Sequence, residues 1–394
     1  CHHVSSVSFE QVLRQVTATF VYGLTATPIR KDGHQPIIFM QCGKIRFTSD
    51  AKSQMENQGF KRLLIPRFTS FRSITSDRKT YVQITQELSE DKVRNEFVME
   101  DVKAAIQKGR TPLLLTTRTA HVKVLAQMLM PFADHVIQLI GADSAKEKRL
   151  ALQNLQSIPT SESLVIVATG KYVGEGFDYP RLDTLFLTMP IAWKGNVEQY
   201  AGRLHRECEG KSEVCIYDYV DIRVPLCDSM YRKRLKGYIK AGYGKNVTSP
   251  APDKKSQELI YEQNNYEAAF RNDLAKAKHS VVIAVPKVKF KYKPSIMSAL
   301  ANLLHDGVSV VVHIKEEGAN ETELSNAGMD VVCNKEQTLQ CAIIDKSIVW
   351  YGNINFFGYN SETNNVMRIA DYKIANEMME ILYSATENKA NETR

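Results

Sequence analysis

The stretch Ser163–Pro180 reads SLVIVATGKYVGEGFDYP and joins a continuous apolar run to a polar segment rich in glycine. An apolar run without alternation is typical of a strand in a parallel sheet that helices cover on both faces. Ligands of such folds bind at the carboxyl ends of the strands. We therefore expect a ligand near the residues that follow Thr169.

The segments on either side of this stretch repeat the same pattern. Apolar runs predict strands at 62–73, 111–117, 135–141, 184–190 and 213–220. Amphipathic stretches predict helices at 91–109, 120–132 and 145–156. Strands that alternate with helices of this length predict a doubly wound α/β domain.

The pattern stops at residues 241–256, where Gly, Ser, Pro and Lys gather as in a linker. Beyond this segment, strands are predicted at 280–286, 308–314 and, as a strand–turn–strand, 341–355, with helices at 295–307 and 372–387. At the other end of the sequence, a helix at 8–16 and a strand at 19–28 are too short a unit to bury a core alone.

The composition fits a globular protein with a mildly basic charge. The 394 residues carry a formal net charge of +7, which favours a polyanionic partner. No apolar run approaches the roughly 20 residues of a membrane helix. Seven cysteines without a CxxC pair argue against a disulfide framework or a zinc cluster, so we expect a cytoplasmic protein with no metal site of its own.

A second informative stretch is EQYAGRLHRE, residues 198–207. Its spacing predicts that Gln199, Arg203 and Arg206 share one face of a helix. One interpretation is a solvated face with salt bridges. The other is a set of side chains that stabilise a phosphate, since a planar and permanently charged guanidinium suits the charge of a phosphoryl group in transfer.

Four segments in order decide between these interpretations. YGLTATPIRKDG (22–33), LLLTTRTAHVKVL (113–125), ATGKYVGEGFDYP (168–180) and EQYAGRLHRE resemble motifs III, IV, V and VI of superfamily 2 DNA helicases of the DExH type. The opening CHH resembles the end of motif II. The resemblance implies an ATP-dependent helicase or translocase whose second lobe is RecA-like.

The resemblance also implies roles for single residues. The nucleotide side would be served by His2, Thr25, Thr27, Gly176 and Asp178. The nucleic-acid backbone would lie along Thr116, Arg118, Thr169 and Gly170. Gln199, Arg203 and Arg206 would be catalytic and face the γ-phosphate of ATP. The partner would be nucleic acid, with DNA favoured over RNA.

Two parts of such a motor are absent from the sequence. There is no GxxxxGK[ST] phosphate loop, and no Asp-Glu pair precedes Cys1. We expect ATP and Mg²⁺ to be bound mainly by a first lobe of which residues 1–60 are the end. On this view the chain is the C-terminal part of a longer helicase and is inactive as an ATPase alone.

The segment TLQCAIIDKSIVWYGNIN, residues 338–355, resembles the phospholipase D-like pattern HxKxxxxD followed by GSxN. The nucleophilic histidine is replaced by Thr338 and the lysine by Gln340, whereas Asp345 is retained. The later residues correspond to Gly352, Asn353, Ile354 and Asn355. Because the reaction needs histidine as a covalent nucleophile, we expect an inactive fold that holds DNA or forms a homodimer.

Two basic segments have two interpretations each. Residues 231–245 mix Arg and Lys with tyrosines, and residues 287–293 alternate lysine with apolar residues. Both compositions suit contact with a nucleic-acid backbone. The alternatives are a solvated helix and an edge strand protected by lysines. Trp350 is expected to be a packing residue.

The combined prediction is an α/β protein in four parts: the end of helicase lobe 1 (1–60), RecA-like lobe 2 (61–240), a linker (241–256) and a phospholipase D-like domain (257–394). Two other functions stay open. One is a phospholipase D-like nuclease of the restriction type with a helicase motor. The other is a non-catalytic module that binds nucleic acid or dimerises. No membrane association is expected.

Overall fold

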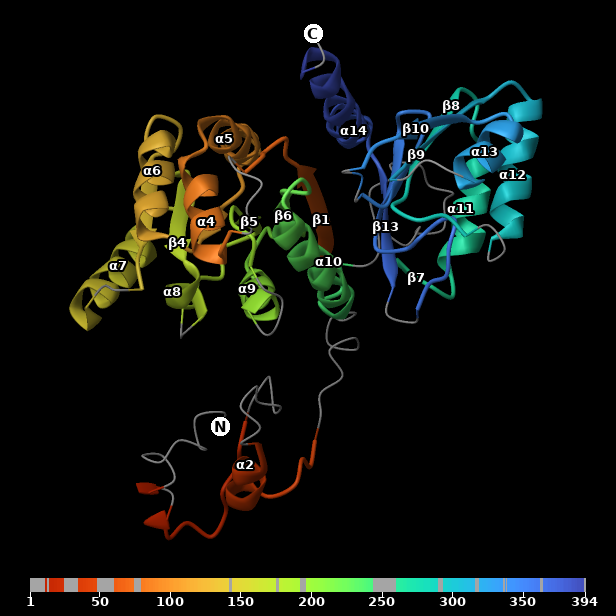
Figure 1. Ribbon diagram of the computed structural model, residues 1–394. Coiled ribbons are helices and arrows are strands. Elements are labelled where there is room, and N and C mark those ends of the chain that lie inside the picture. Colours follow the sequence, from red (N-terminus) through yellow and green to blue (C-terminus); the bar gives the residue numbers. More distant parts are fainter. Residues whose placement is uncertain are drawn as a thin grey trace. The chain divides into compact units, whose positions relative to one another are not determined.

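The structure is a computed structural model (Figure 1). It describes residues 11–12, 14–24, 35–47, 60–73, 79–141, 144–174, 177–191, 196–243, 260–289, 293–315, 319–335, 337, 339–361 and 364–392. The chain divides into two compact units, Cys1–Gln58 and Gly59–Arg394.

The described part of the first unit contains helix α2 (Gln35–Cys42). Residues 19–24, which open the predicted strand at 19–28, form no strand. A strand requires a partner for its backbone groups, and none of the described residues of this unit is in a strand. Of the predicted helix at 8–16, residues 11, 12 and 14 are helical, whereas residues 8–10 and 13 lie outside the described residues.

The second unit begins with a parallel sheet of six strands in the order β1-β6-β5-β2-β4-β3. Its strands are β1 (Lys61–Phe68), β2 (Pro112–Thr116), β3 (His135–Leu139), β4 (Leu164–Thr169), β5 (Thr184–Leu187) and β6 (Glu213–Val220). Pro66, which has no N–H to donate, is tolerated within β1 because that strand forms an edge of the sheet. All of the strands predicted for this region are therefore confirmed.

Helices cover both faces of this sheet, and each face has its own apolar core. The helices are α4 (Tyr81–Glu90), α5 (Lys92–Gln107), α6 (Thr119–Leu129), α7 (Ala145–Ser157), α8 (Gly170–Gly174), α9 (Asn196–Leu204) and α10 (Pro225–Lys240). Helices α5 and α6 pack on one face. Side chains of α7, α8, α9 and α10 pack on the other face. The arrangement confirms the predicted α/β class, with a doubly wound parallel sheet.

The beginnings of two of these helices follow from their sequences. Ser144 precedes α7 and accepts the N–H of Glu147, whose carboxylate accepts the N–H of Ser144 in return. Thr80 and Gln83 form the same reciprocal pair at the start of α4. Such capping boxes satisfy backbone N–H groups that have no partner inside the helix.

A second sheet of seven strands follows, in the order β10-β9-β8-β11-β12-β13-β7. Its strands are β7 (Ile260–Glu262), β8 (Ser280–Ala284), β9 (Ser309–Ile314), β10 (Asp330–Cys333), β11 (Cys341–Ile344), β12 (Ile348–Gly352) and β13 (Asn365–Ala370). Its helices are α11 (Tyr266–Leu274), α12 (Pro294–His305), α13 (Ala319–Asn326) and α14 (Tyr372–Glu392). Side chains of α11, α12 and α13 pack on one face of this sheet and those of α14 on the other.

The two sheets share an apolar core within Gly59–Arg394. The ring of Phe68 in β1 meets the ring of Tyr351 in β12 edge to face at 5.0 Å. Tyr231 of α10 donates its hydroxyl hydrogen to the sulfur of Met367 in β13, at 3.3 Å. Two residues at the start of the predicted linker, Ala241 and Tyr243, are buried, so they pack with the first sheet; the division into four parts otherwise stays a prediction.

Among the described residues, no helix combines the length and the apolar character needed to cross a membrane.

Candidate nucleotide and nucleic-acid site

The carboxyl edge of the six-stranded sheet gathers segments from three of the predicted motifs. Strands β2 and β4 are parallel neighbours, and their last residues, Thr116 and Thr169, are paired in register. The Thr169 hydroxyl accepts the backbone N–H of Gly141 at 2.9 Å. This bond fastens the segment after β3 to the end of β4. Thr169 is itself buried, so its side chain has a structural role at this edge of the sheet.

Gly170, the next residue, connects motif V to motif VI. The Tyr200 hydroxyl in α9 donates to the carbonyl oxygen of Gly170 at 3.0 Å. A Cβ atom on Gly170 would lie 2.4 Å from the Tyr200 hydroxyl oxygen, which is closer than real Cβ contacts. The absence of a side chain at position 170 therefore allows α9 to approach the end of β4.

The predicted shared helix face of motif VI is only partly correct. Helix α9 ends at Leu204, so Gln199 and Arg203 lie in it, whereas Arg206 lies in a bend beyond its end. Gln199 is exposed and Arg203 is half-buried. Directly after the helix, the Nε2 atom of His205 lies 3.0 Å from the Tyr243 hydroxyl, and the two rings stack. Burial, followed by the charges of Arg62 and Lys211, lowers the pKa of His205 to about 3.

Arg206 and Asp178, both predicted for the nucleotide side, lie together. The Arg206 Nε atom donates to the Asp178 Oδ1 atom at 3.1 Å. The two side chains are 54% and 47% exposed. An exposed ion pair contributes only about 0–1 kcal/mol. The pair therefore matches the salt-bridge interpretation, yet it is too weak to prevent Arg206 from binding a phosphate instead.

Thr116, predicted to contact the nucleic-acid backbone, is fully buried, and this part of the prediction is wrong. Its Oγ1 atom lies 2.9 Å from His121 Nδ1, and His121 Nε2 lies 3.0 Å from Asn95 Oδ1. Because the Asn95 amide nitrogen donates to the Ser89 carbonyl, its oxygen faces the histidine. His121 therefore carries its proton on Nε2 and accepts the Thr116 hydroxyl on Nδ1.

This chain of bonds ties the motif IV segment to α5 through a neutral histidine. Burial, followed by the charges of Arg94 and Arg118, lowers the pKa of His121 to about 3. Arg118 remains half-buried after β2, and its Nη1 atom donates to the Val82 carbonyl at 3.3 Å. Of the two motif IV residues, only Arg118 is placed to contact a ligand.

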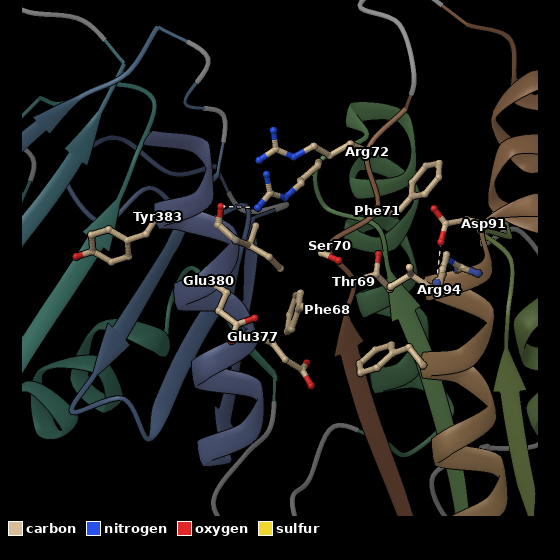
Figure 2. A pocket seen from close by; sticks show the side chains of 14 residues that line it. Phe68, Thr69, Ser70, Phe71, Arg72, Asp91, Arg94, Glu377, Glu380 and Tyr383 are labelled. Carbon is tan, nitrogen blue, oxygen red and sulfur yellow. Dashed lines mark hydrogen bonds between the residues drawn. The ribbon is translucent and has the colours of Figure 1, made fainter. Parts of the chain in front are cut away.

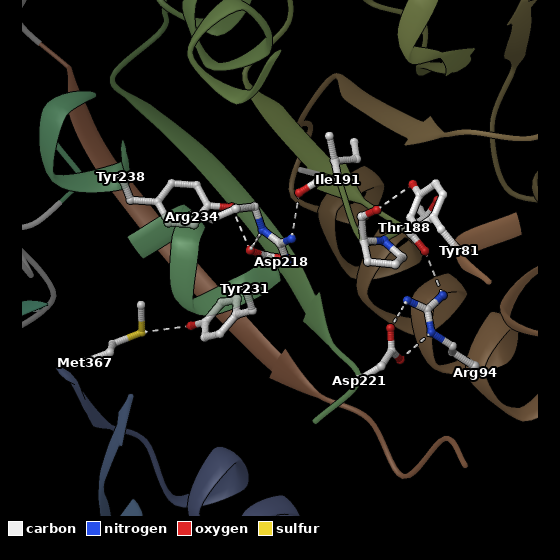
Figure 3. A network of polar contacts seen from close by, with 11 residues as sticks. Tyr81, Arg94, Thr188, Ile191, Asp218, Asp221, Tyr231, Arg234, Tyr238 and Met367 are labelled. Atoms are coloured by element: carbon white, nitrogen blue, oxygen red, sulfur yellow. Dashed lines mark hydrogen bonds and ion pairs between the residues drawn. The ribbon is translucent and has the colours of Figure 1, made fainter. Parts of the chain in front are cut away.

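A buried ion pair supports the same edge of the sheet and was not predicted. Arg94 of α5 binds both carboxylate oxygens of Asp221 at 2.7 and 3.0 Å (Figure 3). Its third nitrogen donates to the Thr188 carbonyl after β5, at 2.7 Å. The Thr69 hydroxyl after β1 donates to Asp221 at 2.5 Å. Arg94 therefore connects the segments that follow three adjacent strands.

A second buried pair occupies part of the basic segment 231–245. Arg234 of α10 binds both oxygens of Asp218 at 2.7 and 2.9 Å (Figure 3). The Tyr238 hydroxyl donates to the same carboxylate at 2.6 Å. Arg234, Tyr231 and Tyr238 are all buried, so they stabilise the lobe and do not form a stacking surface. The sequence feature that could have indicated this buried pair is Asp218, a charged residue within the apolar run 213–220.

In the second sheet, the structure separates the predicted phospholipase D-like residues. The Gln340 carbonyl accepts the N–H of Gly352, and Asn353 follows directly, so these residues lie at one end of β11 and β12. Asp345 lies at the other end of β11. Its carboxylate accepts the backbone N–H groups of residues 278, 279 and 280 at 2.8, 2.8 and 2.9 Å. Although burial alone would raise it, these three donors lower the pKa of Asp345.

The two asparagines at the first end hold backbone segments. Asn353 Oδ1 accepts the N–H of Asn365 at 2.7 Å. Asn355 Nδ2 donates to the Lys287 carbonyl and its Oδ1 accepts the N–H of Phe357, both at 2.9 Å. Both side chains therefore have structural partners.

The second basic segment is only partly described, and its described residues form no strand. Lys287 and Lys289 are exposed on either side of buried Val288, and Lys293 binds Glu267 at 2.8 Å. Trp350 is fully buried, as expected, and its indole N–H donates to Asp273.

Five predicted site residues lie outside the described residues: His2, Thr25, Thr27, Gly176 and Thr338. In the parts of the chain that the structure describes, no three His, Cys, Asp or Glu side chains gather as a metal ion requires.

Parts of this chain resemble known proteins. No family model matches the chain. The transcript termination protein A18 of Myxoma virus (strain Lausanne) is 27% identical over 155 residues, which is 38% of this chain and 31% of the relative. The chain thus spans about a third of the length of that relative.

Solved structures resemble separate parts of the chain. T4 UvsW has a TM-score of 0.38 at 17% identity, covering 53% of this chain and 43% of that structure. Nuc from Salmonella typhimurium, a phospholipase D family member, has a TM-score of 0.28 at 20% identity, covering 33% of this chain and 91% of that structure.

Proposed function

We propose that residues 60–243 form the second RecA-like lobe of an ATP-dependent superfamily 2 helicase or translocase that moves on nucleic acid. The observation that carries this proposal is the contact between motifs V and VI. Tyr200 binds Gly170, and Arg206 binds Asp178, so the predicted nucleotide and nucleic-acid segments meet at one edge of the sheet. The printed name of the relative, transcript termination protein A18, supports a nucleic-acid partner.

This lobe would contribute electrostatic stabilisation of the phosphate charge during ATP hydrolysis. ATP and Mg²⁺ would be held mainly by a first lobe, and Gln199, Arg203 and Arg206 would reach the γ-phosphate when the lobes close. An arginine supplied across a cleft in this way contributes on the order of 10³ to 10⁵ in rate. Because catalysis would then require closure, hydrolysis would be coupled to movement on the strand.

The test is the nucleic-acid-stimulated ATPase of a protein in which this chain is extended by a complete first lobe. Arg206→Ala should abolish the stimulated rate and leave ATP binding largely intact. Arg149, which is exposed on α7, supplies the matched control, and Arg149→Ala should keep the rate of the parent. Normal turnover in Arg206→Ala would overturn the proposal.

For residues 260–392 we propose a role in holding DNA or in dimerisation, with no nuclease activity. Thr338 and Gln340 replace the histidine and lysine of the phospholipase D-like pattern. The carboxylate of Asp345 accepts three backbone N–H groups, at the end of β11 opposite to Gln340. Metal-independent DNA cleavage by the chain, lost in Asp345→Asn, would contradict this proposal.

A further inference from the structure

Lys211, in the loop between α9 and β6, binds backbone where other charged residues of this unit bind side chains. In the cleft between the first sheet and helix α14, for example, Glu377 binds the Arg67 side chain at 2.7 Å (Figure 2). Arg94, which lines the same cleft, binds the Asp221 side chain at 2.7 Å. The Lys211 ammonium group instead donates to backbone carbonyl oxygens.

Three carbonyl groups surround this ammonium group. The Lys211 Nζ atom donates to the carbonyl oxygens of Arg206 at 2.7 Å and of Leu204 at 3.1 Å. It also donates to the Pro180 carbonyl. Because an ammonium group has three N–H donors, all of them are used. Lys211 could therefore bind a phosphate only by giving up one of these bonds.

The three carbonyl groups belong to the segments of motifs V and VI. Pro180 ends the motif V stretch, two positions after Asp178. Leu204 is the last residue of α9, and Arg206 lies in the bend beyond it. Carbonyl groups at the end of a helix have no partner within the helix, and a positive charge is favourable there. Lys211 thus satisfies the end of α9 and fastens it to the end of motif V.

A turn in the loop brings Lys211 back to these carbonyl groups. The Lys211 backbone N–H donates to the Cys208 carbonyl at 3.1 Å. Gly210, the residue before it, has a φ of +79°, a left-handed conformation that glycine adopts without steric cost. The sequence of the loop therefore supports the position from which Lys211 reaches Arg206.

The backbone of Arg206 needs such support. Arg206 lies beyond the helix end, and its ion pair with Asp178 is exposed and therefore weak. Half-buried Lys211 binds the backbone on both sides of that pair, at Arg206 and near Asp178. Accurate placement matters for a catalytic group, since a displacement of about 1 Å can cost about 10²-fold in rate.

We propose that Lys211 is a positioning residue for Arg206. By binding the ends of motifs V and VI, it holds the backbone from which the Arg206 guanidinium reaches the γ-phosphate. The inference rests on the proposed function, because it requires Arg206 to act on that phosphate. Lys211 itself does not contact the nucleotide, since its three donors are used within the lobe.

The test measures kcat of the nucleic-acid-stimulated ATPase, together with the affinity and stoichiometry of ATP binding, in this chain extended by a complete first lobe. Lys211→Met keeps the length of the side chain and removes its donors, so kcat should fall about 10- to 100-fold. ATP should bind with the affinity and stoichiometry of the parent. Lys211→Arg keeps a charge and N–H donors and should retain more of the rate than Lys211→Met.

Lys108 supplies the matched control, because it is an exposed lysine directly after α5. Lys108→Met removes the same charge and should keep the kcat of the parent. Equal losses of rate in Lys211→Met and Lys211→Arg would contradict the inference. So would fewer bound ATP molecules with an unchanged kcat for each of them, since that outcome identifies a purely structural role.

Two further outcomes separate this inference from the proposed function. A parent-like kcat in Lys211→Met, beside a lost rate in Arg206→Ala, would overturn the inference and leave the proposed function intact. Normal turnover in Arg206→Ala would overturn the proposed function itself, and with it the role of Lys211.

Discussion

Gly170 shows at the scale of one residue how closely motifs V and VI are fitted together. Its carbonyl accepts the Tyr200 hydroxyl, and the space for a Cβ atom is occupied by that hydroxyl. The sequence predicted Gly170 as a nucleic-acid contact, but its packing against Tyr200 could not be predicted. The two residues lie 30 positions apart, and only the fold brings them together.

Gly170→Ala should destabilise the chain by about 1–3 kcal/mol, because the added methyl group overpacks a buried contact. Tyr200→Phe removes the oxygen atom that the methyl group would meet. The double variant should therefore be more stable than Gly170→Ala alone, as measured by urea unfolding. Additive effects of the two changes would show that the contact does not constrain this position.

At the scale of elements, continuous apolar runs predicted the strands of the first sheet, because a strand buried on both faces must be apolar along its length. The short strand β7 was not predicted, since three residues carry too little pattern and its place depends on pairing with β13. The sequence of helix α10 could be recognised as basic, but two interpretations of its role stayed open. The partner of Arg234 is Asp218 in another element, so local composition could not identify the pair.

The Arg234–Asp218 pair predicts an asymmetric response to substitution. Asp218→Ala leaves a buried guanidinium without its carboxylate and should cost about 3–5 kcal/mol of stability. Adding Arg234→Met replaces that charge with an apolar side chain and should restore much of the loss. Thermal or urea unfolding of the two variants checks this. A double variant no more stable than Asp218→Ala would show that Arg234 was not the source of the cost.

At the scale of the whole second unit, helix α14 connects the two sheets. Glu377 in this helix binds Arg67 of β1, and burial raises the pKa of Glu377 to about 7 in spite of that charge. A carboxyl group whose pKa is higher in the folded state than in the unfolded state binds an extra proton on folding. Its contribution to stability is therefore complete below pH 4.5 and declines as the pH rises toward 7.

Glu377→Gln keeps the shape of the side chain and removes the titration. We expect the difference in unfolding free energy between parent and variant to shift in favour of the variant from pH 5 to pH 8. Urea unfolding at both pH values measures it. A difference that stays constant would contradict a raised pKa at this position. Neither Glu377 nor its contact with β1 could be predicted from the sequence, since 310 positions separate the partners.

The central claim is that Arg206 acts on a phosphate and not merely in a surface ion pair. Arg206→Lys distinguishes these roles, because lysine keeps a positive charge beside Asp178 but lacks the planar, bidentate guanidinium. The decisive measurement is the nucleic-acid-stimulated ATPase rate of the chain extended by a complete first lobe and carrying this substitution. Our account predicts that the rate is lost, as in Arg206→Ala, while ATP still binds. A rate equal to that of the parent would show that the ion pair with Asp178 is the whole role of Arg206.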